Sequence, residues 1–315
     1  MKDGKYYSAM FEYKPSKREA EEAIRKVIEE KSKRVNGHTT FRAAVDQYIA
    51  MKENVLSPST IRDYSRMCNR LSDWFCDTEI DDITQVTINL QVNEWAARLS
   101  PKTVRNYHGF ISTILGTFRP DFNIHTKLPQ KHKSEPYTPS DDEVKKILEE
   151  LAGKECYVPL ILASFGMRRS EILALTLDDI EGNIVHITKA MVFNKENKLV
   201  VKSTKTTDSE RDIIIPMEIA DMIREKGYVY KGDPSNINDN LIKVEERLGI
   251  QHFSLHKLRH YFASKMLTLT DAETVQALGG WKTDHVMKNV YAHAMKDEKE
   301  KAKRLAAEKL GKSIF

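Results

Sequence analysis

The sequence predicts a mainly α-helical protein of two domains, the second of which also holds a small antiparallel β-sheet and is therefore α+β. Three observations lead to this fold class. The chain has 315 residues, more than a single hydrophobic core usually holds. Apolar side chains recur at helical spacing from about residue 38 to 130. Short runs rich in β-branched residues appear between helical segments after residue 180.

The composition is typical of a folded protein without a membrane span. Apolar residues make up 40% of the chain and charged residues 30%. No stretch approaches the roughly 18 uninterrupted apolar residues of a membrane-spanning helix, and charges stand where a secretory signal would need its apolar segment. The three cysteines have neither metal-ligand spacing nor the even count of a disulfide framework. We therefore expect a cytoplasmic protein without a membrane partner.

Charge is unevenly distributed along the chain. The net charge is only +4, but residues 101–133 hold six basic side chains against one acidic side chain. Residues 134–150 hold six acidic side chains against two lysines. A local basic stripe on a nearly neutral protein fits a polyanion held on one face, and an ordinary solvated surface is the alternative.

The first 130 residues are expected to be helical after a short β-prone tract. A charged helix runs from Lys17 to about Arg34 and is opened by Ser16 and Glu19, which form a capping box. Residues 38 to about 130 then predict a compact all-α domain of four helices joined by short turns, the second running on to Phe75. These helices are expected to begin after Thr40, Ser57, Thr84 and Ser100.

Two of these helices begin at Ser-Pro and carry basic residues close behind. Arg62 and Arg66 follow the first Ser-Pro, and Lys102 and Arg105 follow the second. A helix N-terminus flanked by cations can seat a phosphate, although ordinary capping with surface charge fits equally well. The segment 127–136 has two prolines and no apolar periodicity, so we expect an extended linker that can follow a phosphate backbone. Its candidate phosphate contacts are Lys131 and Lys133.

From Thr138 onward the pattern predicts the α+β domain. Ser140 and Glu143 form a capping box for a helix that ends near Leu151. The other elements expected are helices at 155–165 and 168–177, strands near 184–192, 199–203 and 211–215, helices at 217–226, 235–248, 254–267, 271–279 and 283–291, and a charged helix from about 296.

Polar residues interrupt segments that are otherwise patterned for burial. Arg168 lies in an apolar run, and Glu171 follows it on the same helical face. An arginine inside a fold is costly unless it meets a carboxylate or an external anion. His256 and Arg259 form a second cluster and lie side by side at i and i+3. Taken singly, such features are usually surface ion pairs or helix caps.

A third cluster completes a recognisable order of motifs. Two glycines precede Trp281, and Tyr291 follows ten residues later. With these motifs in this order, residues 38–295 resemble the tyrosine recombinases, the phage-integrase type of site-specific recombinase. The resemblance implies a helical, SAM-like core-binding domain at 38–128, a linker at 129–137 and a catalytic domain at 138–295.

The resemblance also implies a role for each motif residue. Arg168 corresponds to the first catalytic arginine, and Glu171 to its acidic companion. Lys205 corresponds to the lysine of the family's β-hairpin, although Lys202 lies close by. Trp281 stands where most members have histidine and a minority tryptophan. The remaining positions, which match the His-x-x-Arg box and the nucleophile, are His256, Arg259 and Tyr291.

The chemistry of phosphodiester cleavage explains these residue types. The guanidinium groups of Arg168 and Arg259 can bind the two non-bridging oxygens without a metal ion or another cofactor. Tyr291 can attack the phosphorus if His256 accepts its proton, because the unperturbed pKa of tyrosine is about 10. Lys205 is the natural acid for the leaving 5′-oxygen. The phosphotyrosyl ester conserves the bond energy, so rejoining needs no ATP.

The resemblance also leads to expectations for Trp281 and for the two ends of the chain. Trp281 can donate one hydrogen bond but cannot shuttle a proton, so we expect it to support the phosphate or Tyr291. By resemblance, the tail at 296–315 docks on a neighbouring protomer within a homo-tetramer on DNA, with packing onto its own subunit as the alternative. Residues 1–36 look like the end of an arm-binding domain, either truncated or shortened by nature.

The expected function is therefore integration or excision of a mobile element by a DNA recombinase of the bacterial cytoplasm, associated with the nucleoid. Its partners would be double-stranded core recombination sites and an accessory DNA-bending or directionality factor. A type IB topoisomerase would use the same phosphotyrosyl chemistry, and a catalytically silent DNA-binding regulator is a further alternative. The helical domain and the tail favour the recombinase over the topoisomerase, and the complete polar set disfavours the silent regulator.

Overall fold

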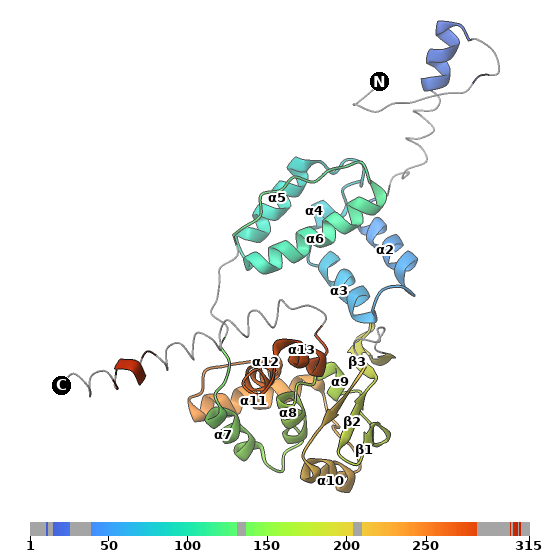
Figure 1. Cartoon of the computed structure of the whole chain (residues 1–315). Helices are drawn as coiled ribbons and strands as arrows, with labels where there is room; N and C mark the ends of the chain where they lie inside the picture. The colour runs from blue at the N-terminus through green and yellow to red at the C-terminus, as the bar shows by residue number, and fades with distance from the viewer. Residues whose placement is uncertain are drawn as a thin grey trace. The chain divides into compact units, whose positions relative to one another are not determined.

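The structure is a computed structural model, which describes residues 11, 15–25, 39–130, 137–203, 210–281, 303, 305–307 and 309 (Figure 1). The chain divides into two compact units. The helical unit comprises residues 1–134 with 193–198, and the second unit comprises residues 135–192 with 199–315. Within the described residues, no helix is both long and apolar enough to cross a membrane.

The first described helix begins where the sequence predicts. Residues 17–25 are helical, and the backbone N–H of Ser16 donates to Glu19 Oε2 at 2.8 Å. The backbone N–H of Glu19 donates in return to Ser16 Oγ at 3.3 Å, which completes the capping box. The expected continuation to Arg34 and most of the β-prone tract before Ser16 lie outside the described residues.

Between residues 39 and 130 the helical unit has five helices rather than the four predicted. Thr40 accepts a hydrogen bond from Ala43 N, and Ser100 accepts one from Thr103 N, which confirms two of the predicted helix starts. A capping box at Thr84 confirms a third. The helices are α2 (Phe41–Lys52), α3 (Pro58–Cys68), α4 (Asp73–Cys76), α5 (Gln85–Ala96) and α6 (Pro101–Phe118).

The prediction of one helix from Ser57 to Phe75 was wrong. Helix α3 ends at Cys68, and the separate short helix α4 begins after Ser72. Ser72 donates from its hydroxyl to Glu94 on α5 at 2.6 Å, a tertiary contact that holds the chain in a turn. Ser57 occupies the N-cap position of α3 but makes no side-chain cap hydrogen bond. The apolar spacing continued through the turn, so periodicity alone could not reveal the break.

The core of the helical unit is aromatic and apolar. Phe41 meets Phe75 and Phe110 edge to face, with ring centroids 5.0 Å and 6.1 Å apart. Trp95 meets Tyr107 in the same way at 5.1 Å. Helix α6 carries the largest share of this core along one face, with Val104, Tyr107, Phe110, Ile111, Ile114 and Leu115 buried.

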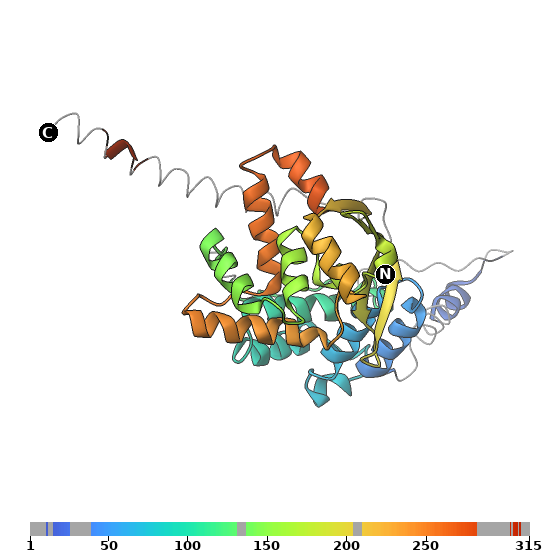
Figure 2. The same cartoon turned by 90° about the horizontal axis from the view of Figure 1, so that it is seen from below.

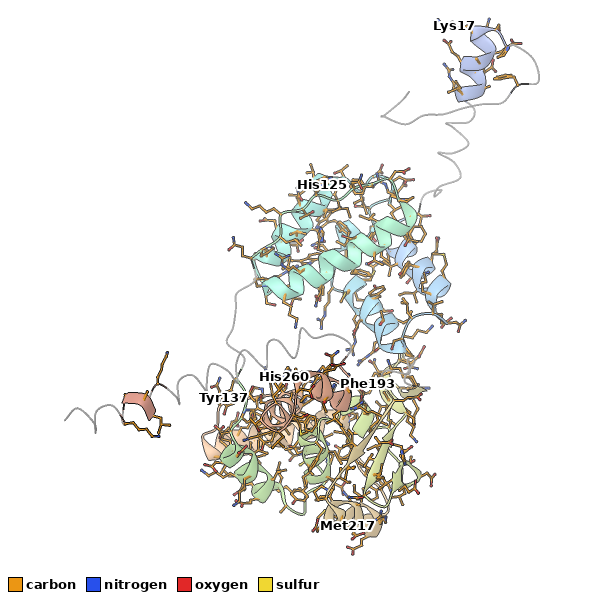
Figure 3. The ribbon with its side chains drawn as sticks, viewed as in Figure 1. Lys17, His125, Tyr137, Phe193, Met217 and His260 are labelled. Atoms are coloured by element: carbon orange, nitrogen blue, oxygen red, sulfur yellow. The ribbon has the colours of Figure 1, made fainter. Side chains whose placement is uncertain are left out.

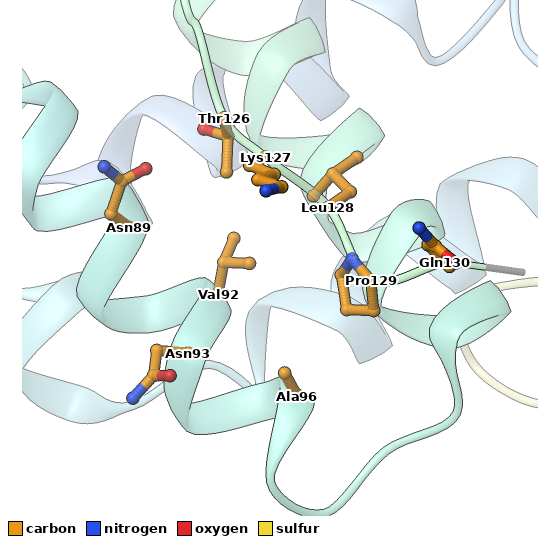
Figure 4. A pocket seen from close by; sticks show the side chains of 9 residues that line it. All are labelled: Asn89, Val92, Asn93, Ala96, Thr126, Lys127, Leu128, Pro129 and Gln130. Atoms are coloured by element: carbon orange, nitrogen blue, oxygen red, sulfur yellow. The ribbon is translucent and has the colours of Figure 1, made fainter.

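The segment after α6 lies against the helical unit up to its last described residue. Leu128 packs on the apolar core, and Arg105 donates to the carbonyl of Pro129 at 2.9 Å. A cavity of about 420 Å³ lies between α5 and residues 126–130 (Figure 4). The part of the expected linker at 131–136, with Lys131 and Lys133, lies outside the described residues.

Along the chain of the second unit, helices come before and after the strands, as expected for an α+β domain. A capping box at Ser140 confirms the start of its first helix. The helices are α7 (Asp141–Leu151), α8 (Tyr157–Ser164), α9 (Arg169–Ile172), α10 (Met217–Lys226), α11 (Pro234–Leu248), α12 (Leu255–Met266) and α13 (Ala272–Gly279), with a 3₁₀ turn at Leu177–Asp179.

The strands form two small antiparallel sheets rather than one. The first has the order β1-β2-β5, and the second pairs β3 with β4. Val185 of β2 pairs with Ile213 of β5, and both face the core. The strand predicted at 184–192 is therefore two strands, because the chain changes pairing partner at Thr188. The strands are β1 (Ile180–Glu181), β2 (Ile184–Ile187), β3 (Lys189–Phe193), β4 (Leu199–Ser203) and β5 (Arg211–Ile214).

The helix predicted at 168–177 was also too long. Only Arg169–Ile172 form α9, and Thr176 starts a new turn by accepting and donating hydrogen bonds with Asp179. Helix α8 is the centre of the apolar core, with Val158 to Ala163 buried. It packs against α12 and α7, and Figure 2 shows it among these helices. After α8 the chain turns at Gly166, next to the first polar cluster.

Candidate functional site

Arg168 stands at the end of a sharp turn that follows α8. Gly166 has φ +90°, and a Cβ there would lie 2.8 Å from the ring of Phe262, so only glycine fits without strain. Arg168 is the N-cap of α9, and its backbone N–H donates to Glu171 Oε2 at 2.8 Å. Its guanidinium Nη1 donates to Glu171 Oε1 at 2.5 Å. The pairing of Arg168 with Glu171 is thus as the sequence predicts.

Arg259 is buried on α12, with 1% of its surface exposed. Its two terminal nitrogens donate to the carbonyl oxygens of Gly166 and Gly279. Its Nε is buried and has no hydrogen-bond partner within the described residues. Burial, together with the positive charge of Arg168, lowers the pKa of Arg259 to about 9, which still leaves the group protonated at neutral pH.

The end of α13 brings the two predicted catalytic arginines together. Arg168 Nη2 donates to the carbonyl of Gly280 at 2.5 Å, while Arg259 donates to the carbonyl of the preceding residue, Gly279. The centre of the Trp281 ring lies 4.1 Å from Cζ of Arg259, a cation–π contact. Arg168, Arg259 and Trp281, which are far apart in the sequence, therefore share one location.

His256 lies one helical turn before Arg259, and its side chain is exposed. The protein packed around the ring, followed by the charges of Arg259 and Arg168, lowers the pKa of His256. The ring meets His260 (labelled in Figure 3) edge to face, with centroids 5.2 Å apart. Burial and nearby cations lower the pKa of His260 to about 4. Both imidazoles are therefore neutral at pH 7, the state in which His256 can accept a proton.

The sequence reasoning missed Arg211, the first residue of β5. Its guanidinium donates to both carboxylate oxygens of Glu171, at 3.2 Å and 2.8 Å. Burial alone would raise the pKa of Glu171, but hydrogen bonding and charge from Arg211 and then Arg168 lower it overall. A signal was present in the sequence. Side chains two residues apart on a strand lie on the same face, so Arg211 is expected on the inward face with the buried Ile213 and Ile215.

The guanidinium groups of Arg168 and Arg211 thus bond one carboxylate, and the buried guanidinium of Arg259 lies near enough to interact with its charge. Glu171 is 3% exposed and is the only acidic side chain within the described residues that bonds Arg168, Arg211 or Arg259. Counted over the described residues, the site therefore carries an excess of positive charge. A buried excess of this kind favours binding of an external anion, and guanidinium groups fit the oxygens of a phosphate.

A second unpredicted contact holds the start of α12. Glu245 of α11 is 1% exposed and accepts from the backbone N–H of Phe253 at 3.1 Å. The same carboxylate lies 2.6 Å from Nδ1 of His252. Asn238, also on α11, accepts from the backbone N–H of Leu255 at 3.3 Å. These contacts fix the chain just before His256. Glu245 follows the buried Val244 on the inward face of α11, which was the available signal.

Two predicted active-site residues, Lys205 and Tyr291, lie outside the described residues, so their roles stay predictions. The neighbouring Lys202 on β4 is described and half-buried. The described part of the chain holds no cluster of three or more His, Cys, Asp or Glu side chains arranged for a metal ion.

The predicted DNA contacts of the helical unit have different surroundings. Nitrogens of Arg62 and Arg66 both donate to Asn197 Oδ1 at 3.0 Å, within the same unit. Lys102 is exposed, whereas Arg105 is half-buried and bonded to Pro129. Lys102 alone among these four has the simple surface position that the sequence predicts. The contacts of all four with DNA remain predictions.

Comparison with known proteins decides the family. Residues 140–298 match the Phage integrase family, and residues 40–96 match the N-terminal SAM-like domain of phage integrases. The chain belongs to the phage integrase family. The resemblance to tyrosine recombinases inferred from the motifs is therefore confirmed, as is the combination of a SAM-like helical domain with an α+β domain.

Curated relatives of this phage integrase family member are tyrosine recombinases. A XerC-like tyrosine recombinase of Caldanaerobacter subterraneus subsp. tengcongensis is 26% identical over 255 residues, which cover 64% of this chain and 65% of that protein. The tyrosine recombinase XerD of Rickettsia bellii is 24% identical over 299 residues, which cover 82% of this chain and 96% of that protein.

Solved integrase structures share the fold. The Tn1549 transposon integrase in complex with transposon right-end DNA has a TM-score of 0.64 at 18% identity, with 85% of this chain and all of that chain covered. A lambda integrase tetramer bound to a Holliday junction has a TM-score of 0.61 at 17% identity, with 87% of this chain and 90% of that chain covered.

Proposed function

We propose that this chain is a site-specific DNA recombinase that cleaves and rejoins DNA through a 3′-phosphotyrosyl intermediate, for integration or excision of a mobile element. One observation carries the proposal. The guanidinium groups of Arg168 and Arg259 bond the carbonyls of adjacent residues, Gly280 and Gly279, at a location with excess positive charge. Two arginines held side by side match the two non-bridging oxygens of one phosphodiester.

The bonds described above do not use every N–H of the two guanidinium groups. Each terminal nitrogen of a guanidinium carries two hydrogens, so donation to a carbonyl leaves a second N–H on each. Glu171 holds Arg168 from the opposite side, and the Trp281 ring covers Arg259. These contacts fix both groups before DNA binds. Preorganised donors stabilise developing charge without the cost of reorganising in the transition state.

The proposed cleavage step balances without a cofactor. The phenolic oxygen of Tyr291 forms a bond to phosphorus, and the bond from phosphorus to the 5′-oxygen breaks. His256 accepts the phenolic proton, for which its neutral state is suited. Lys205 donates a proton to the leaving oxygen. The reverse sequence, with a 5′-hydroxyl of the partner strand, rejoins the DNA.

The helical unit would provide most of the grip on double-stranded DNA at the core site. Its candidate contacts are Arg62, Arg66, Lys102, Arg105, Lys131 and Lys133. We further propose a homo-tetramer on DNA in which the tail at 296–315 docks on a neighbouring subunit, with an accessory factor that bends DNA or sets direction. The lambda integrase solved as a tetramer on a Holliday junction supports this assembly.

A suicide substrate tests the chemistry. On DNA nicked beside the cleavage site, the wild type should accumulate a covalent complex because the short 5′-hydroxyl fragment diffuses away. Tyr291→Phe should bind the same DNA and form no complex. The matched control is Tyr228→Phe, which removes the hydroxyl of a tyrosine that donates to Glu155 in the second unit. A covalent complex with Tyr291→Phe would show that the nucleophile is misassigned.

Exchange between two DNA sites separates a recombinase from a topoisomerase. Two labelled duplexes that carry the core site should yield recombinant strands and a Holliday-junction intermediate with the wild type. Relaxation of supercoiled DNA without any recombinant product would contradict the proposed function, even if a phosphotyrosyl complex forms.

A further inference from the structure

Arg211 contacts three separate segments of the second unit. Besides its two bonds to Glu171, its Nε donates to the carbonyl of Leu278 at 3.1 Å, and its Nη2 lies 3.5 Å from the carbonyl of Gly166. The side chain is 6% exposed. Its guanidinium is therefore enclosed by the turn before α9, the carboxylate on α9 and the end of α13.

Each group that Arg211 contacts either bonds Arg168 or Arg259 as well or lies next in sequence to a group that does. Glu171 is the carboxylate that bonds Arg168. The Gly166 carbonyl also accepts from Arg259. Leu278 immediately precedes Gly279 and Gly280, whose carbonyls accept from Arg259 and Arg168. A shift of Arg211 would therefore be transmitted to the bonding partners of both arginines.

Arg211 also anchors the strand that follows the predicted catalytic lysine. Lys205 lies six residues earlier, in the segment that joins β4 to β5. Arg211 pairs with Ile187 at the end of β2, and its side chain fastens this end of β5 to α9 and α13. The first residue of β5 is thus held beside the bonding partners of the two arginines.

We propose that Arg211 is a positioning residue that sets Arg168 and Arg259 in register around the scissile phosphate. This inference rests on the proposed function. Arg211 does not touch DNA in this account and acts through Glu171 and the carbonyls at the end of α13. A planar fork is required, because only guanidinium can bond two carboxylate oxygens and two carbonyls that lie in different directions.

Arg211→Lys tests the fork while keeping the charge. We expect single-turnover cleavage at saturating DNA to fall about ten- to a hundredfold, the scale for small displacements of catalytic groups, with unchanged DNA affinity. The matched control, Arg247→Lys, alters an exposed arginine that pairs with Glu150 on the surface and should leave cleavage unchanged. Wild-type cleavage by a folded Arg211→Lys variant, with thermal unfolding like that of the wild type, would overturn the proposal.

The pH dependence of cleavage gives a readout that loss of stability alone would not move. Arg211 lowers the pKa of Glu171, so in Arg211→Gln this pKa should rise. Glu171 would then be protonated at a higher pH and would release Arg168. Protonation of the base His256 contributes to the acidic limb of the pH–rate profile in both proteins, and the added protonation of Glu171 should move this limb to higher pH in Arg211→Gln. A lower rate with an unmoved profile would contradict the proposal.

A third measurement separates failure of this inference from failure of the proposed function. A crystal structure of Arg211→Lys does not depend on any cleavage activity. It should show the guanidinium of Arg168 withdrawn from the Gly280 carbonyl, or α13 displaced from β5. Unchanged contacts of Arg168 and Arg259 would overturn the inference, whether or not the wild type forms a covalent complex with DNA.

Discussion

The two units of the chain differ most in what they bury. Among the described residues, the helical unit buries a single polar side chain, Gln91, which is neutral and bonds Ser72 and Glu94. The second unit buries the charged residues Glu171, Glu245 and Arg259 and also encloses the side chain of Arg211. Burying a charge costs free energy that an apolar residue would not. The contrast indicates that the helical unit is built for stability, whereas the second unit keeps charges inside for a site.

Two glycines beside the site differ from the two glycines of helix α6. Gly109 and Gly116 of α6 have open space where a Cβ would lie. In the second unit, a Cβ at Gly166 would lie 2.8 Å from the Phe262 ring, and one at Gly279 would lie 1.7 Å from the Trp281 ring. Gly166 and Gly279 therefore allow close approach of backbone carbonyls and aromatic rings to Arg259.

The largest expected effect sharpens the assignment of chemistry to the second unit. Lys205→Ala should reduce cleavage by about 10²- to 10⁴-fold, the usual range for loss of general acid catalysis. A substrate with sulfur in place of the leaving 5′-oxygen should largely restore the rate, because a thiolate leaves without a proton. The control, Lys202→Ala, should be restored no more by sulfur than the wild type. If the sulfur substrate restored the rate of Lys202→Ala and not that of Lys205→Ala, Lys202 would be the general acid.

A large effect on stability is expected in the helical unit. Ile111 is fully buried on α6, so Ile111→Ala should lower the free energy of unfolding by about 2–5 kcal/mol through lost burial and a cavity. Urea unfolding of the full chain, followed by tryptophan fluorescence, measures this loss. At a temperature where the variant is folded, cleavage at saturating DNA should stay at the wild-type rate. A slower chemical step would break the division of roles between the units.

A moderate effect is expected from Gly279→Ala. The added methyl group would collide with Trp281 and displace the ring from Arg259. Cleavage should fall about fivefold, since one supporting contact worth roughly 1 kcal/mol would be lost. Single-turnover kinetics measures the loss, and the position of Trp281 can be checked by its fluorescence. A wild-type rate would show that the tryptophan does not hold the arginine for catalysis.

The smallest effect has the opposite sign and lies in the helical unit. Gly116 is exposed in the interior of α6 with no atom near its missing Cβ. Gly116→Ala should therefore raise the free energy of unfolding by about 0.5–1 kcal/mol, because alanine loses less backbone entropy in a helix. Thermal unfolding measures the gain. Destabilisation would mean that a contact at Gly116, rather than open space, determines its role.

Local signals predicted much of the fold. The capping boxes predicted at Ser16 and Ser140 each mark a helix start that the structure confirms, and the helix start predicted after Thr84 is also confirmed. The helices α10 to α13 lie close to their expected ranges. The errors arose where tertiary contacts decide the chain path. Ser72 turns the chain by bonding Glu94, and the strand predicted at 184–192 is divided because its halves pair with different strands.

The site was predictable only where its contacts are local or its motifs are known. Arg168 and Glu171 are three residues apart, so their pairing follows from helix geometry. The bonds from Arg211 to Glu171 span 40 residues, and those from Arg168 to Gly280 span 112. Nothing in the local pattern of either arginine specifies its distant partner. The sequence therefore identified Arg168 and Arg259 through their motifs. The fold was needed to identify Arg211, which contacts the bonding partners of both.

The most direct test of the central claim replaces the scissile phosphate by a methylphosphonate. This change substitutes a methyl group for one non-bridging oxygen and removes the negative charge that Arg168 and Arg259 would meet. On ordinary DNA, Arg168→Ala and Arg259→Ala should each cleave at least about tenfold more slowly than the wild type. On methylphosphonate DNA this penalty should largely disappear. An equal penalty on both substrates would show that the two arginines do not act on the scissile phosphate.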